Sequence, residues 1–152
     1  MATTRDEARF GETAVVPPGG QPDGPLEVVV LHTTTKGTLQ ALRTAAALAQ
    51  GLAARIRLLV PQTVPYPLPL ASPSIPKDFT ERRFRTVASE VAVETYIDIR
   101  LCRDRWVLLE SALKPRSLVV LGGRRSWWPT SESRLARRLQ RLGHQVVFAN
   151  FK

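Results

Sequence analysis

The sequence predicts an α/β fold, in which one parallel β-sheet is covered by helices on both faces. Short β-branched runs alternate with amphipathic segments along the chain, which is the pattern of repeated βαβ units. The run VVVL at 28–31 is apolar at every position, as is typical of a strand that is buried on both faces. With 152 residues, 43% of them hydrophobic, the chain is long enough for one domain with a substantial core.

The first 25 residues differ in composition from the rest of the chain. Prolines and glycines are concentrated at 17–25. Such a segment cannot bury enough apolar surface to offset the entropy of ordering it. We therefore expect a flexible N-terminal arm at 1–25 and a single folded domain at 26–152.

The first βαβ unit follows the arm. A β-branched run predicts a strand at 26–32, and leucines and alanines at helical spacing predict a helix at 38–54. Thr35 or Thr38 is expected to cap this helix, because a threonine hydroxyl can accept a hydrogen bond from a free backbone N–H. The run RIRLLV predicts the second strand at 55–60.

The middle of the chain begins with a proline-rich segment. Six prolines at 61–76 exclude a helix or a central strand, so we expect a loop there. A helix with a narrow apolar face is predicted at 77–92, and partial alternation predicts a strand near the sheet edge at 93–101. Apolar residues on one face predict a further helix at 104–114.

The last βαβ unit occupies the C-terminal third. The run SLVVLGG predicts a strand at 117–123, and leucines at helical spacing predict a helix at 131–143 that ends at Gly143 as its C′ glycine. The run HQVVFANF predicts a final strand at 144–151.

The composition also limits the class of function. The net charge is +9, and most of the cationic residues are arginines spread along the chain. This charge fits either an anionic partner or ordinary solvated surfaces, and the dispersal favours the second, so nucleic acid is not the expected partner. The single cysteine, Cys102, excludes an internal disulfide. No apolar run is long enough to span a membrane and no secretory signal is evident, so we expect a cytoplasmic protein.

Two loops are the expected site. In parallel α/β sheets, ligands bind beyond the carboxyl ends of the strands, where the strand order reverses. The segments HTTTKG at 32–37 and GGRRSWWPTSES at 122–133 follow the first and fourth predicted strands. A glycine-bearing loop between a strand and a helix is a common place for a phosphate.

The region 26–151 resembles the universal stress protein (UspA-like) family. The apolar strand followed by an Ala/Leu-rich helix, the proline-bearing loop after the second strand and SLVVLGG carry the resemblance. It implies a three-layer α/β/α, Rossmann-like (adenine nucleotide alpha hydrolase-like) fold whose five strands have the order 3-2-1-4-5. It also implies a homodimer through the last strand (Val146, Val147, Phe148) and, in some members, bound ATP or AMP.

The resemblance implies a nucleotide site that departs from the family pattern. Its residues would be His32, Thr33, Gly122, Gly123, Arg125, Ser131 and Ser133. His32 stands where the family has an aspartate that recognises adenine, and Arg125 stands at a signature glycine. Trp127, Trp128 and Pro129 add bulk and remove an N–H. We therefore expect nucleotide binding to be lost or altered, with the two tryptophans filling the vacated site or packing at a subunit contact.

Two alternatives stay open. Arg124 and Arg125 could hold a phosphate by their side chains together with the helix start at 130–133, with ATP or AMP as the ligand. The hydroxyl groups there equally predict plain N-capping. The second alternative is nucleic-acid binding through a basic stripe on the last helix, with the tryptophans as a stacking surface. The stripe consists of Arg134, Arg137, Arg138 and Arg141.

No catalytic motif is evident. His32 and His144 lack a nearby nucleophile or carboxylate in any known arrangement. We therefore expect a protein that is not an enzyme and that acts by dimerisation and by binding a protein partner.

Overall fold

The computed structural model of the protein describes residues 26–124 and 126–151, so the predicted arm at 1–25 lies outside the described residues. The elements are β1 (Glu27–Leu31), α2 (Thr35–Leu52), β2 (Arg55–Thr63), α3 (Lys77–Ala88), β3 (Thr95–Cys102), α4 (Arg105–Ala112), β4 (Leu118–Arg124), α5 (Ser131–Arg141) and β5 (Gln145–Phe151). Each predicted helix and strand is present.

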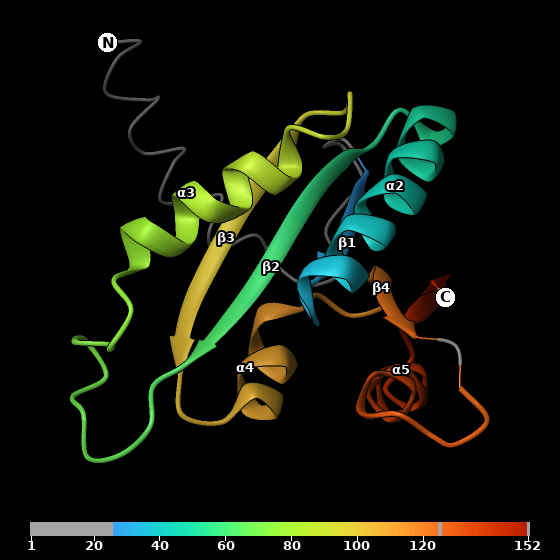
Figure 1. Ribbon diagram of the computed structural model, residues 1–152. Coiled ribbons are helices and arrows are strands. Elements are labelled where there is room, and N and C mark those ends of the chain that lie inside the picture. Colours follow the sequence, from blue (N-terminus) through green and yellow to red (C-terminus); the bar gives the residue numbers. More distant parts are fainter. Residues whose placement is uncertain (1–25, 125, 152) are drawn as a thin grey trace, which may run out of the picture.

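The five strands form one parallel sheet in the order β3-β2-β1-β4-β5. Helices α2 and α3 cover one face, and α4 and α5 cover the other (Figure 1). The predicted three-layer Rossmann-like fold and its strand order are confirmed. The reversal of strand order lies between β1 and β4, so the carboxyl ends of these two strands form the edge where a ligand is expected.

Two apolar clusters, one on each face of the sheet, form the core. On the first face, Ala41, Leu42 and Ala45 of α2 pack with Phe84 of α3 against the sheet. On the second face, Leu109 of α4 and Leu139 of α5 do the same. Strand β1 contributes to both clusters, because its central residues Val28–Leu31 are buried. Its uninterrupted apolar run is therefore explained by burial on both sides.

The first helix begins earlier than predicted. Helix α2 starts at Thr35, and its N-cap is Thr34, whose hydroxyl accepts a hydrogen bond from the N–H of Gly37. The prediction of Thr35 or Thr38 as the cap is therefore wrong. Thr38 is fully buried instead, with its hydroxyl next to the imidazole of His32. At the other end of the chain, Gly143 follows α5 with a positive φ of 97°, as predicted for a C′ glycine.

Strand β2 continues into the predicted proline loop as far as Thr63. Proline is tolerated there because β1 ends two residues before it. The carbonyl of Leu59 accepts a hydrogen bond from the N–H of His32, so the backbone groups of Leu59 point toward the β1 side. The backbone groups of Pro61, two residues later, point to the same side. At Pro61 that side holds no strand, so its missing N–H removes no ladder bond. Residues 60–63 pair with β3 alone.

An arginine is buried within the sheet. The side chain of Arg57 on β2 donates to Asp98 of β3 at 2.8 Å and to the carbonyl of Ala112 in α4 at 3.3 Å. Only 8% of Arg57 is exposed. Buried charges need such partners, because an unpaired buried charge costs several kcal/mol. This network joins two strands and one helix.

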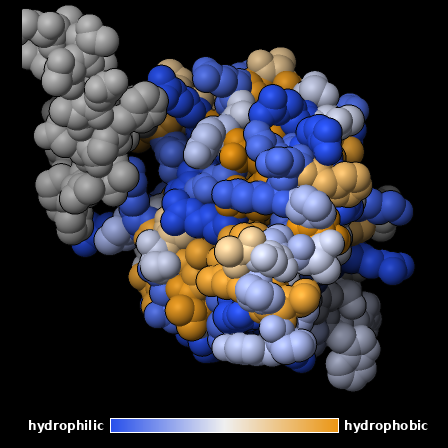
Figure 2. All heavy atoms as spheres, turned by 90° about the vertical axis from the view of Figure 1, so that its left-hand side faces the viewer, coloured by the Kyte–Doolittle hydropathy of each residue, from blue (hydrophilic) through white to orange (hydrophobic). Residues whose placement is uncertain are grey.

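The face beside β3 exposes several large apolar residues. Figure 2, which looks at the left-hand side of Figure 1, shows apolar patches interspersed among hydrophilic residues. The exposed apolar residues of the proline-rich segment, α3 and β3 are Tyr66, Leu70, Ile75, Phe79 and Tyr96.

Candidate functional site

The carboxyl ends of β1 and β4 meet, as the sequence predicts. The hydroxyl of Thr33 donates to the carbonyl of Gly122 at 2.6 Å. This bond joins the two segments that the sequence analysis singled out, although 89 positions separate these residues. His32, Thr33 and Gly122 therefore share one rim, and this hydrogen bond closes the rim between the strands.

The glycines of the fourth strand allow close packing at this rim. Gly122 and Gly123 lie inside β4 and not in a loop. A Cβ atom on Gly122 would lie 1.9 Å from the carbonyl oxygen of Gly37 in α2. One on Gly37 would lie 2.6 Å from the carbonyl oxygen of Gly122, and one on Gly123 would meet the ring of Phe148 at 2.6 Å. The two glycines thus have a packing role that needs no phosphate.

His32 is held by its neighbours in a neutral form. Its Nδ1 lies 2.7 Å from the hydroxyl of Thr38, and its ring meets that of Phe84 edge-on at 4.7 Å. Burial, together with the nearby charges of Arg105 and Arg83, lowers the pKa of His32 from 6.5 to about 4. A neutral ring packed in this way is fixed in place at the β1 end.

Arg105 also reaches this rim, although no motif in the sequence marks it as a site residue. Its guanidinium donates to the carbonyl of His32 at 2.8 Å. Its Nε is buried without a hydrogen-bond partner in the described part of the chain. Burial lowers the pKa of Arg105, although nearby Glu132 opposes this shift. The only signal in the sequence is its place directly after the third strand, which also ends at this side of the sheet.

The hydroxyl groups at the start of α5 cap the helix. The hydroxyl of Thr130 accepts from the N–H of Ser133 at 3.1 Å, and that of Ser133 accepts from the N–H of Thr130 at 2.9 Å. This reciprocal pair is a capping box, as the N-capping interpretation predicted. Ser131, by contrast, lines an open cleft.

A first cleft, of about 300 Å³, lies between the segment 126–130 and β5, and we call it the tryptophan cleft. It is lined by Arg124, Ser126, Trp127, Trp128, Pro129, Thr130, Ser133, Arg137, Phe148 and Asn150. Trp127 is 99% exposed and Trp128 is 80% exposed. The expectation that these residues fill a vacated site is therefore wrong, since side chains that fill a site would be buried. Arg125 of the predicted site lies outside the described residues.

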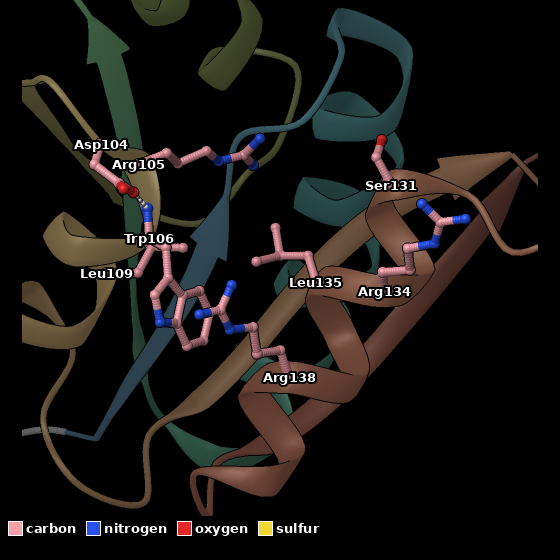
Figure 3. A pocket seen from close by; sticks show the side chains of 8 residues that line it. All are labelled: Asp104, Arg105, Trp106, Leu109, Ser131, Arg134, Leu135 and Arg138. Carbon is pink, nitrogen blue, oxygen red and sulfur yellow. Dashed lines mark hydrogen bonds between the residues drawn. The ribbon is translucent and has the colours of Figure 1, made fainter.

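A second cleft, of about 390 Å³, lies between α4 and α5, and we call it the α4–α5 cleft. It is lined by Asp104, Arg105, Trp106, Leu109, Ser131, Arg134, Leu135 and Arg138. Figure 3 shows Trp106 and Arg138 stacked across it, with Leu135 pointing inward from α5. The guanidinium carbon of Arg138 lies 3.8 Å from the ring centroid of Trp106.

The predicted nucleotide-binding serines and the arginines of α5 are distributed between the two clefts. Ser131 lines the α4–α5 cleft, whereas Ser133 lines the tryptophan cleft. Arg134 and Arg138 line the α4–α5 cleft, and Arg137 lines the tryptophan cleft. The two flanks of this arginine face therefore border different clefts, although positions 134, 137, 138 and 141 share one face of the helix.

The predicted dimer residues on β5 are packed within the chain itself. Val147 packs against the first core cluster, and Val146 and Phe148 pack against the second. Their side chains are half-buried, and the homodimer through them stays a prediction. The backbone edge of β5 away from β4, however, pairs with no strand of the described chain.

Three other features bear on the type of site. None of the described helices is long and apolar enough to cross a membrane. No group of three metal-binding side chains occurs among residues 26–124 and 126–151. Cys102 is buried, and burial raises the pKa of its thiol, so it packs as a small apolar residue.

Comparison with solved structures identifies a similar fold. A crystal structure of a universal stress protein in complex with cAMP matches with a TM-score of 0.51 at 17% sequence identity. The match covers 86% of this chain and all of that protein's chain. At this identity the likeness is one of fold alone. No protein-family model and no curated protein matches the sequence.

Proposed function

We propose that this chain is a non-catalytic universal stress protein-like domain of the cytoplasm. It acts in stress response through a homodimer and a protein partner, and it does not bind nucleotide in the family manner. The closed rim between β1 and β4 carries this proposal. Thr33 bonds directly to Gly122, and Arg105 holds the carbonyl of His32, so groups of the chain itself bond to one another at the edge where a ligand of this fold is expected.

The free edge of β5 supports the homodimer. A strand edge with unpaired N–H and C=O groups invites pairing with another chain. The N–H of Gln145 points toward β4, because it donates to the carbonyl of Ser117. Backbone groups alternate in direction along a strand, so the N–H groups of Val146, Phe148 and Asn150 point away from β4. Two β5 strands that meet across a two-fold axis would satisfy these groups.

The variant Asn150→Pro tests this dimer. Asn150 is exposed, and its outward N–H makes no bond to β4, so proline there removes an edge donor and leaves the β4–β5 ladder intact. We expect the wild type to sediment as a dimer and Asn150→Pro to weaken that dimer at least about tenfold, with Asn150→Ser as the control. A wild type that stays monomeric at high concentration would contradict the homodimer.

The tryptophan cleft favours nucleotide binding in an altered mode as the second candidate. Arg124 and Arg137 line this cleft together with the two exposed tryptophans, so it offers guanidinium groups for phosphate and aromatic rings for a base. The neighbour of similar fold was crystallised with cAMP, which is a ligand of that protein.

Thermal shift with ATP, AMP and cAMP distinguishes the two candidates. The leading proposal predicts that none of the three gives a stabilisation that Arg124→Ala removes. A stabilisation that disappears in Arg124→Ala and persists in Arg43→Ala, a control remote from both clefts, would favour the second candidate.

A further inference from the structure

We infer that the α4–α5 cleft binds a small phosphate ester, with Arg105, Arg134 and Arg138 as the residues that hold the phosphate. This site goes beyond the proposed function, because it does not depend on the β5 dimer; it shares only Arg105 with the rim between β1 and β4. It lies between two helices on one face of the sheet, and side chains from both helices line it.

Three guanidinium groups around one cleft are the first observation. None of the three forms an ion pair with a carboxylate in the described part of the chain, although four other pairs do form there. Like charges gathered without counter-charge are unfavourable, so a local cluster of this kind favours a bound anion. Guanidinium groups present paired N–H donors that match phosphate oxygens.

Arg105 supplies a second, independent observation. Its Nε is buried and has no partner among the described residues, while its terminal nitrogen is fixed by the carbonyl of His32. A buried donor without an acceptor is unfavourable, and an anion in the cleft that Arg105 lines would supply an acceptor after a small shift of this side chain. The fixed end also orients the guanidinium before any ligand binds.

The remaining walls define the rest of the ligand. Leu109 is buried at the base of the cleft, and Leu135 and the indole of Trp106 provide apolar surface beside it. Cavities of this size commonly hold one small molecule. A phosphate on a flat or apolar body therefore fits this cleft better than a free inorganic ion does.

Two acidic groups near the cleft do not cancel its charge. Asp104 lines it, but its carboxylate accepts the N–H groups of Trp106 and Val107 and so caps α4. Glu132 lies close enough to influence Arg105 without forming an ion pair. The arginines thus outnumber these acidic groups by three to two, and one of the two is engaged with the backbone.

Phenyl phosphate is the probe, and Trp106 is the reporter. The chain has three tryptophans, so a Trp127→Phe/Trp128→Phe background leaves Trp106 as the only one. Because Arg138 stacks on Trp106, a phosphate that draws Arg138 away changes the environment of the indole. We expect saturable quenching or enhancement of its fluorescence, with no change for phenol, which has the ring without the phosphate.

Paired variants on α5 make the test specific. Arg134→Gln/Arg138→Gln and Arg137→Gln/Arg141→Gln remove the same charge at the same spacing from one helix, but only the first pair lines the cleft. The first pair should weaken binding at least about tenfold, and the second less than about twofold. Equal losses would assign binding to the general charge of the helix, and no saturation with the background protein by isothermal titration calorimetry would exclude the site. Pyrophosphate binding as tightly as phenyl phosphate would contradict the role of the apolar walls.

Discussion

At the scale of single residues, the contact between Gly37 and Gly122 decides how closely the first helix approaches the fourth strand. Both backbones come so near that a single added methyl group overlaps a carbonyl oxygen. Neither backbone can move without shifting a helix or a central strand, because Gly37 lies in the first turn of α2 and Gly122 lies within β4. The need for glycine at these two positions is therefore steric.

We predict that Gly122→Ala lowers the free energy of unfolding by at least about 3 kcal/mol, the upper end of the usual cost of overpacking. Gly51→Ala is the matched control, because Gly51 lies in α2 with no atom within 4 Å of its added Cβ. It should stabilise the protein by about 0.5–1 kcal/mol through helix propensity. Urea denaturation measures both, and a Gly122→Ala protein as stable as the wild type would refute the steric role.

The pKa of His32 leads to a second prediction at this scale. The folded state holds it at about 4 and the unfolded chain at its ordinary 6.5, so the unfolded state binds the extra proton between these values. Stability is therefore complete above pH 6.5 and falls by about 3 kcal/mol as the pH drops to 4. Asp98 has a lowered pKa as well, so its contribution is lost only at still lower pH.

Chemical denaturation at a series of pH values measures this dependence. His32→Gln should flatten the stability profile between pH 6.5 and 4. His144→Gln should keep the larger part of the slope, although burial lowers the pKa of His144 also. An unchanged slope in His32→Gln would show that other groups control acid stability.

At the scale of elements, the network around Arg57 ties β2 to β3 and to α4. Burial tends to raise the pKa of Asp98, but the hydrogen bonds from Arg100 and Arg57 outweigh it and lower that pKa overall. The carboxylate is thus bound in its charged form by two arginines. Loss of Arg57 or of Asp98 leaves the charge of the other residue in a site with little access to water.

We predict that Asp98→Asn destabilises the protein by about 1–3 kcal/mol, because the buried Arg57 then keeps only Glu27, which lies farther away at 3.6 Å and is more exposed, as its counter-charge. The double variant Arg57→Met/Asp98→Leu should be more stable than Asp98→Asn, since it removes both charges. Glu81→Gln, which breaks the exposed pair with Arg85, should cost less than about 0.5 kcal/mol. Additive effects of the two core changes in a double-mutant cycle would contradict this coupling.

The elements themselves could be predicted from the sequence wherever burial shaped the pattern. Strand β1 was recognisable because both of its faces are buried, and α5 because its leucines recur at helical spacing. The start of α2 was missed because three successive threonines compete for the cap, and only the position of Gly37 against β4 favours Thr34. The length of β2 was missed because proline normally ends a strand, and the end of β1 at Leu31 removes that restriction.

At the scale of the whole molecule, strand order could be anticipated, and with it the meeting of His32 and Gly122 at one rim. The residues that line the two clefts could not be anticipated from the sequence. Arg105 comes to His32 from a helix 73 positions away, and no local pattern marks such a contact. The division of the α5 arginines between two clefts depends on where α4 and β5 lie, which periodicity within α5 alone does not reveal.

The overhang of β2 beyond β1 has a mechanical consequence. From Val60 to Thr63, β2 is supported by β3 alone, and the long proline-rich connection starts where this two-stranded ribbon stops. A force applied to that connection would reach the ribbon before the central strands. The last residues of β2 and β3 could separate while β1, β4 and their rim stay intact, so tension from a tethered neighbour would be absorbed at the periphery of the sheet.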